Sequence, residues 1–267
     1  MTSSVIQDLF GQTLVGDYDD EAPWDAVSTL RSNGDRAIFE TAALWLKSTN
    51  PLKRARAAAI LAQLRAPSRS QEEMKKPTWL FRDETFSLLV ELLEGESDAM
   101  VLNSGIAALG HLYNEAAIPI IERYKEHSDQ DVRFSVACAL GKFPNDQVAI
   151  SALIPLTRDP DSEVRDWAIF GLGVQGDADS PEIREVLLQG ISDPDEDVRE
   201  EATVGLGKRQ DLRLLPTLRN MLDAPELKVR IAEAASAMLG LPEDPEEWAA
   251  EDYKKALDEK FGRAERA

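Results

Sequence analysis

Apolar positions along the chain recur at helical spacing. In one recurring phrase, small or apolar residues stand four, seven and eight positions after a small aliphatic residue, called the anchor below. This spacing is one face of a helix with 3.6 residues per turn. Where Val164 is the anchor, for example, the face continues with Ala168, Gly171 and Leu172. No segment alternates between apolar and polar residues for long, so the pattern predicts helices and no strands.

The phrase repeats along most of the chain. Six copies have their anchors at Ala55, Val101, Val132, Val164, Val198 and Val229. The last five anchors are 31, 32, 34 and 31 residues apart, and the first gap, of 46 residues, contains an insertion. An acid three positions before an anchor can cap the start of the helix. Five anchors have one: Asp98, Asp129, Asp161, Asp195 and Glu226.

A second amphipathic segment precedes each anchor helix. Its isoleucine and leucine residues also follow a helical spacing, and Asp159-Pro160 and Asp193-Pro194 indicate turns between the two segments. Neither helix of such a pair can bury its apolar face without a neighbouring pair. The sequence therefore predicts an all-α stack of about six helix–turn–helix repeats.

The consensus of the phrase, D-x-x-V-R-x-x-A-x-x-A-L-G, resembles the short HEAT-like repeat of the phycobilisome-lyase type. The resemblance covers residues 37–241 and implies a right-handed α-α superhelix, a HEAT-like solenoid. The predicted segments are an N-terminal cap segment at 1–36, the solenoid at 37–241 with a loop insertion at 65–80, and a C-terminal cap helix at 242–267. Trp248, Tyr253 and Leu257 are expected on the inner face of the cap helix.

Charge narrows the choice of partners. The chain has 49 acidic and 30 basic residues, a formal charge of -19. Such a body repels phosphate backbones and anionic lipid, so we expect neither nucleic acid nor a membrane as partner. Residues 50–82 carry a net charge of +6 and residues 145–210 a net charge of -9. The acidic region is either a solvated surface or one that steers a basic protein; steering predicts binding that weakens with salt.

Cysteine usage and the start of the chain predict a cytoplasmic protein. Cys138 is the single cysteine, so an intramolecular disulfide is impossible, as is common in reducing compartments. The first residues lack the basic and apolar regions of a secretory leader, and no apolar run approaches 18 residues.

An arginine follows the anchor in five of the six copies. A single active site does not need five copies, so the recurrence indicates a structural role. The resemblance implies that these arginines form a ladder with aspartates between the helices. The predicted ladder residues are Arg56, Arg133, Arg165, Arg199, Arg230, Asp129, Asp161 and Asp195.

The fourth repeat departs from the others on the stripe beside its apolar face. Positions three, six and ten after the anchor are Trp167, Phe170 and Val174, where other copies have smaller or polar residues. The predicted partner-binding residues are Phe134, Trp167, Phe170, Val174, Asp166, Glu200 and Glu201. Aromatic rings with acids around them suit a contact hot spot on the concave face. Alternatively, the rings fill contacts between adjacent repeats.

Sequence motifs for catalysis, metal binding or cofactor binding are weak. The G-x-G-x-x-G match at 171–176 ends a helix instead of joining a strand to one, and the two histidines, His111 and His127, lack metal-ligand spacing. We therefore assign no catalytic, metal or cofactor residue.

The favoured function is a non-enzymatic solenoid (an adaptor, assembly factor or toxin-neutralising binder) that engages a basic partner protein. The alternative is a phycobilin lyase or isomerase subunit that binds a linear tetrapyrrole against Trp167 and Phe170. The oligomeric state stays open.

Overall fold

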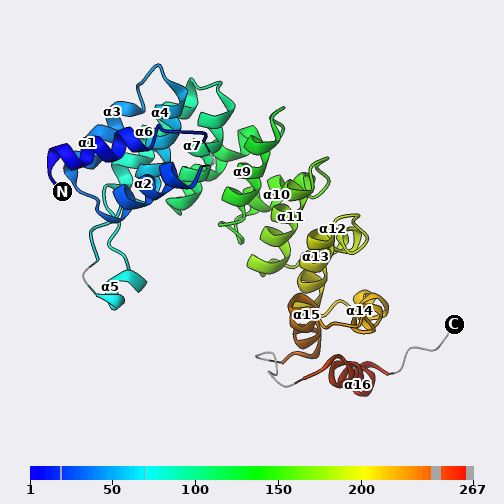
Figure 1. Ribbon diagram of the computed structural model, residues 1–267. Coiled ribbons are helices and arrows are strands. Elements are labelled where there is room, and N and C mark those ends of the chain that lie inside the picture. The colour runs from blue at the N-terminus through cyan, green and yellow to red at the C-terminus, as the bar shows by residue number, and fades with distance from the viewer. Residues whose placement is uncertain (19, 69, 242–247, 263–267) are drawn as a thin grey trace. The chain divides into compact units, whose positions relative to one another are not determined.

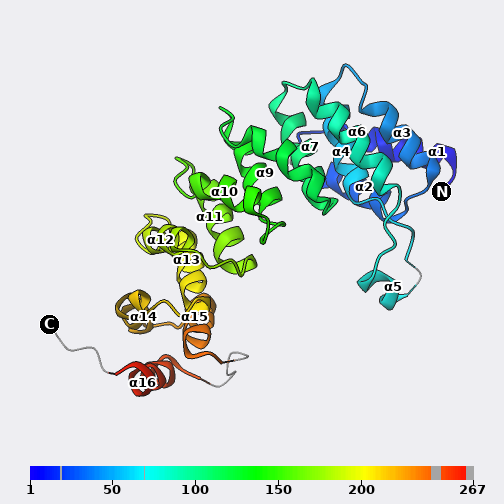
Figure 2. The same cartoon turned by 180° about the vertical axis from the view of Figure 1, so that it is seen from behind.

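A computed structural model describes residues 1–18, 20–68, 70–241 and 248–262. Within these residues the regular elements are helices. One isolated β-bridge pairs Arg65 with Trp79. The chain divides into two compact units, residues 1–139 and 140–267. Figures 1 and 2 show the helices of each unit from opposite sides. No helix in the described part of the chain is long and apolar enough to span a bilayer.

The first unit contains three helical pairs preceded by two further helices. Its elements are α1 (Ser3–Gln12), α2 (Glu21–Ser32), α3 (Arg36–Trp45), α4 (Pro51–Ala62), α5 (Gln71–Lys75), α6 (Arg82–Glu94), α7 (Ala99–His111), the 3-10 turns η1 (Glu115–Ala117) and η2 (Glu122–Tyr124) around α8 (Ile118–Ile121), and α9 (Gln130–Leu140). Helices α4 and α7 pack side by side, with α3 and α6 beside them. Ile60, Leu89 and Ile106 are completely buried in this core.

The second unit also contains three pairs. Its elements are α10 (Gln147–Leu156), α11 (Ser162–Phe170), the π-helical turn η3 (Gly171–Gln175), α12 (Pro181–Gly190), α13 (Glu196–Lys208), η4 (Leu212–Leu214), α14 (Leu215–Leu222), α15 (Val229–Leu239) and α16 (Ala250–Phe261). The anchor helices α11, α13 and α15 lie next to one another, and α12 and α14 cover their other side. Each helix thus buries its apolar face against neighbouring pairs, as the period of the sequence requires.

Capping aspartates begin most anchor helices. Asp161 accepts hydrogen bonds from the backbone N–H groups of Glu163 and Val164 at 3.0 and 3.2 Å, and Asp98, Asp129 and Asp195 cap in the same way. These four positions were predicted from the acid before the anchor. Glu226 does not cap, because α15 begins after Lys228, which provides no side-chain cap.

The caps correct the register of the first and last repeats. In the four middle copies the anchor stands three residues after the cap. The same count from Asn50, which caps α4, gives Lys53, and from Lys228 gives Ile231. The predicted anchors Ala55 and Val229 are therefore two residues out of register. Val229 is 80% exposed, whereas Ile231 is buried.

The predicted end segments and the insertion contain helices. The predicted N-terminal cap segment, residues 1–36, contains α1 and α2. The insertion at 65–80 holds the short helix α5 as well as loop. In α16, Tyr253 and Leu257 are buried, and the Trp248 ring meets Tyr253 edge-on at 5.1 Å. Residues 242–247 and 263–267 of the predicted C-terminal cap lie outside the described residues.

Candidate partner-binding site

The aromatic pair of the fourth repeat lies on one side of α11. The rings of Trp167 and Phe170 meet edge-on, with centroids 5.5 Å apart and planes at 81°. Both side chains are half-buried, as is Val174 on η3. On α13 the position equivalent to Phe170 is Val204, which is completely buried. Trp167, Phe170 and Val174 therefore lie beside the contact between neighbouring anchor helices, and the two rings are partly exposed to solvent.

Arg230 of α15 reaches across α13 to this pair. Its guanidinium carbon lies 5.8 Å from the centre of the Phe170 ring. Its Nη2 donates a hydrogen bond to Glu201 Oε1 at 2.6 Å, and its Nη1 donates to Glu233 Oε2 at 2.8 Å. The side chain of Arg230 remains 32% exposed. One arginine thus joins three successive anchor helices at the aromatic pair.

Two carboxyl groups beside the rings are incompletely bonded. Asp166 Oδ1 and Glu201 Oε2 are buried and have no hydrogen-bond partner in the part of the chain that the structure describes. Burial raises the pKa of Asp166 to about 6, and the nearby charges of Asp197 and Asp195 add to this rise while Arg230 opposes it. Burial raises the pKa of Glu201 to about 7, with Arg230 opposing and Asp166 adding to the rise. Buried oxygens without a donor destabilise a fold when the carboxyl groups are ionised.

The other predicted binding residues differ in their surroundings. Glu200 is paired with Lys228 at 2.5 Å, and Lys228 also contacts Glu196 at 2.6 Å. Lys228, just before α15, and Arg230 within it therefore neutralise two of the acids, Glu200 and Glu201, that were predicted around the aromatic pair. Among the described residues Asp166 has no ion pair. Phe134 is half-buried on α9, in the first unit, whereas the other six predicted residues belong to the second.

The repeated arginines bind the loop inside their own repeat. Arg165 donates from Nη1 to the carbonyl oxygens of Asp159 and Pro160 at 3.0 and 3.2 Å. Its Nε and Nη2 form a fork on the carboxylate of Asp193 in the next repeat, at 2.9 and 2.8 Å. Arg133 and Arg199 donate to the corresponding carbonyls of their own loops. The acid of this rung is Asp193, two residues before the cap, because Asp195 and its counterparts Asp129 and Asp161 are used as helix caps.

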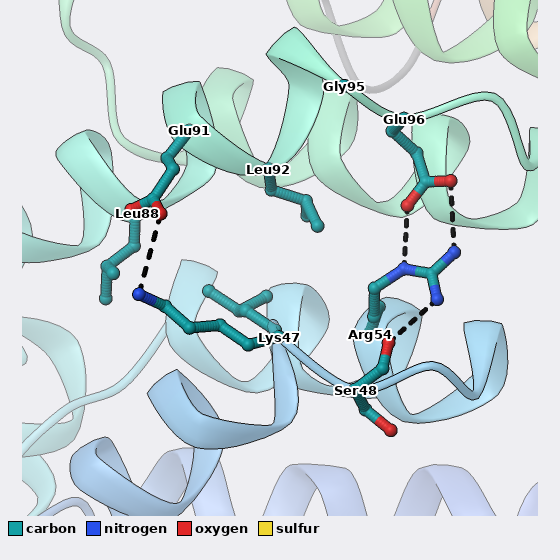
Figure 3. Close-up of a pocket in the computed structure, with 9 residues that line it drawn as sticks. Lys47, Ser48, Arg54, Leu88, Glu91, Leu92, Gly95 and Glu96 are labelled. Atoms are coloured by element: carbon teal, nitrogen blue, oxygen red, sulfur yellow. Dashed lines mark hydrogen bonds and ion pairs between the residues drawn. The ribbon is translucent and has the colours of Figure 1, made fainter.

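The matching rung of the first unit is made by Arg54 (Figure 3). Its Nε and Nη2 bind Glu96 at 2.7 and 3.0 Å, and its Nη1 donates to the carbonyl oxygen of Ser48 at 2.9 Å. Beside this rung lies a cavity of about 320 Å³. Arg54, four residues after the cap Asn50, holds the position that the sequence analysis gave to Arg56. Counting from Asn50 would have identified it.

Arg56 and Arg230 therefore stand outside the ladder that was predicted for them. Arg56 is 1% exposed and donates to the carbonyl oxygens of Thr13 and Tyr18. Its guanidinium lies 4.5 Å from the Tyr18 ring and 4.6 Å from the Trp24 ring. It thus ties α4 to the segment between α1 and α2. Arg230 sits two residues after the cap position of α15 and takes part in the aromatic site instead.

The glycine-rich run at 171–176 allows neighbouring helix backbones to pack closely. A Cβ on Gly171 would lie 3.0 Å from Gly141 Cα, and one on Gly173 would lie 3.3 Å from Gly205 Cα, so helix backbones approach closely here. Arg209 donates hydrogen bonds to backbone carbonyls of this run and its surroundings: Leu172, Gly173, Gly176, Ala178 and Gly205. Carbonyls turned toward a cation do not form a phosphate cradle. The sequence analysis missed Arg209, whose role depends on contacts more than 30 residues away.

No group of three or more histidine, cysteine, aspartate or glutamate side chains in the described ranges is placed to hold a metal ion. A family model of HEAT repeats matches residues 86–173 and 150–238, more than half of the chain. The protein belongs to the HEAT-repeat family.

Solved structures agree with this assignment at the level of the fold. The Escherichia coli protein YibA is 22% identical, with a TM-score of 0.71 over 99% of this chain and 93% of its own. An archaeal HEAT-like repeats protein from Thermococcus onnurineus is 16% identical, with a TM-score of 0.51 over 87% of this chain and 95% of its own. The search of curated proteins found no match. The predicted all-α, HEAT-like solenoid fold is confirmed.

Proposed function

We propose that this HEAT-repeat protein is a non-enzymatic binder that holds a basic segment of a partner protein against α11, α13 and α15. The observation that carries the proposal is the pair of orphaned carboxyl oxygens, on Asp166 and Glu201, beside the edge-on rings of Trp167 and Phe170. A cationic side chain would supply the missing donors and would lie against an aromatic face. An adaptor, an assembly factor or a toxin-neutralising binder in the cytoplasm could each use such a surface.

Charge supports a basic partner. Residues 145–210 carry 15 acids and six bases, and the site lies within or next to this stretch. A surface with this excess attracts cationic proteins from a distance and accelerates their association at low salt. The half-buried carboxylates then act over a short range, where the effective dielectric constant is lower than in water. The same groups argue against the tetrapyrrole alternative, because Asp166, Glu201 and Arg230 put charge where an apolar wall is needed.

A peptide titration tests the proposal. Arginine- and lysine-rich peptides with a fluorescent label are titrated with the protein at 50 and 500 mM NaCl, and binding is followed by anisotropy. We expect binding that weakens at least tenfold with the added salt. Trp167→Ala should abolish it while leaving the helical circular dichroism signal and the melting temperature nearly unchanged.

Trp79→Ala is the matched control, since Trp79 is an exposed tryptophan in the first unit. Affinity that is unchanged by salt, or unchanged in Trp167→Ala, would contradict the proposal. A large fall in melting temperature would show that Trp167 is a core residue. Asp166→Asn then provides a second test, because it removes a carboxylate that makes no ion pair among the described residues. An absorbance titration with a linear tetrapyrrole tests the alternative: a spectral shift lost in Trp167→Ala would favour it.

A further inference from the structure

The start of α15 differs from the starts of α9, α11 and α13, the three anchor helices before it. Two residues after the cap position, α9, α11 and α13 carry an acid, respectively Asp131, Glu163 and Asp197. Helix α15 has Arg230 there, and the residue at its cap position, Lys228, provides no side-chain cap. A cation at this end opposes the helix dipole. A local conflict of this kind is typical of residues that are kept for a contact elsewhere.

The contact that Arg230 makes is incomplete. Its two terminal nitrogens bind two different carboxylates, one oxygen on Glu201 and one on Glu233. In the same unit Arg165 forms a fork on both oxygens of Asp193. Such a fork is the stronger arrangement, because both carboxylate oxygens receive a donor. Arg230 instead leaves Glu201 Oε2 without a partner, and Asp166 Oδ1 stays unpartnered beside it.

We propose that Arg230 is an internal ligand in a guanidinium seat, and that an arginine of the partner displaces it. The proposal rests on the proposed function and names the side chain that this site recognises. The seat consists of the Phe170 ring and the carboxyl groups of Asp166 and Glu201. An incoming arginine can form a fork on Glu201, which Arg230 does not do here. A lysine cannot, because its ammonium is a point donor without a planar fork.

Displacement follows from burial. Asp166 Oδ1 and Glu201 Oε2 are closed to solvent, so the partner's donors reach them only if a side chain moves away. Arg230 occupies the other oxygen of Glu201, Oε1, so its departure frees that oxygen for a donor of the partner. Its side chain is 32% exposed and makes one hydrogen bond to each of two carboxylates. Two hydrogen bonds and the contact with the Phe170 ring are therefore what an incoming arginine has to replace.

The experiment compares Arg230→Ala with Lys254→Ala. Lys254 pairs with Asp223 and Glu251 on the outer elements α14 and α16, so its loss changes the charge of the unit equally without touching the seat. Binding of a labelled arginine-rich peptide is measured by anisotropy at 50 mM NaCl. We expect Arg230→Ala to bind about tenfold more tightly than the wild type, and Lys254→Ala to gain less than twofold. An equal gain in both variants, or none in Arg230→Ala, would overturn the proposal.

A second measurement uses the wild type alone and does not depend on how the variant folds. Peptides of equal length and charge, one rich in arginine and one in lysine, are compared with a neutral citrulline version. We expect at least a fivefold preference for arginine over lysine, and no binding of the citrulline peptide. Equal affinity for arginine and lysine would contradict the seat while leaving the proposed function intact. If no charged peptide binds wild type or variants, the proposed function itself fails.

Discussion

Glu96 in the first unit and Glu201 in the second each form an ion pair with an arginine, but the two pairs differ in how completely the glutamate is bonded. Both accept hydrogen bonds from an arginine of another repeat, and both side chains are largely covered, with 7% and 13% exposure. Glu96 binds the Arg54 fork and also accepts two backbone N–H groups, those of Ser97 and Asp98. Glu201 receives one bond from Arg230 and keeps one orphaned oxygen.

The pKa of each group follows from this difference. Burial acts to raise the pKa of Glu96, but the Arg54 hydrogen bonds and the two N–H groups outweigh it and hold the pKa below its ordinary value. At Glu201 burial prevails over Arg230, and the pKa rises to about 7. The completed ion pair therefore holds its carboxylate ionised, whereas the incomplete one leaves an oxygen that the proposed partner would bind.

The largest effect is expected from the matched substitutions Glu96→Gln and Glu201→Gln. Glu96→Gln leaves Arg54 without its counter-charge and should lower the free energy of unfolding by about 2–3 kcal/mol. Glu201→Gln removes a carboxylate that burial already disfavours and should leave stability unchanged or slightly higher at pH 8. Urea denaturation of both variants measures the difference. Similar losses in both would remove the distinction between the two ion pairs.

A smaller effect is expected when peptide binding is measured against pH. In the proposed seat, Asp166 and Glu201, with pKa values of about 6 and about 7, bind a cation in their ionised form. Affinity should therefore be full near pH 8 and should fall at least fivefold by pH 5.5 as both groups take up protons. The double variant Asp166→Asn, Glu201→Gln should show weak binding with a flat profile. A wild-type profile that is flat over this range would show that neither group contacts the cation.

The smallest effect concerns the stability of Asp166→Asn. The folded pKa of Asp166, about 6, lies above the value of about 4 expected in the unfolded chain. The folded state therefore binds more protons, and ionisation of Asp166 lowers stability as the pH rises from 4 to 6. Removing this carboxyl group should raise the melting temperature by about 1–3 °C at pH 7.5. The gain should vanish below pH 4, and a gain that persists there would point to a different cause.

The sequence predicted the repeat well where side chains were distinctive. Asp161 and Asp195 marked helix starts correctly, because an aspartate before an apolar periodic segment has few other roles. The register failed in α4, where the run of alanines around Ala57 allows several phases to bury an apolar face equally well. It failed in α15 because the helix has no side-chain cap to mark its start.

The candidate site was only partly predictable for a related reason. Trp167 and Phe170 stand out because the sister repeats lack aromatics at these positions, and the structure places their rings in contact. Arg230 lies 60 positions after Phe170 and was assigned by analogy to a ladder. Its path across α13 depends on how three repeats curve together, which no local pattern encodes. Arg209 was missed for the same reason.

The hydrogen bonds of Arg209 bear on the order of assembly. In a stack of repeats, stability is shared between each repeat and its contacts with the nearest neighbours, and parts of the stack can open locally. Here two carbonyl oxygens of η3 accept hydrogen bonds from Arg209, which follows the last residue of α13, so the end of the fourth repeat is fixed by a side chain of the fifth. These two repeats should exchange their amide protons as one cooperative block.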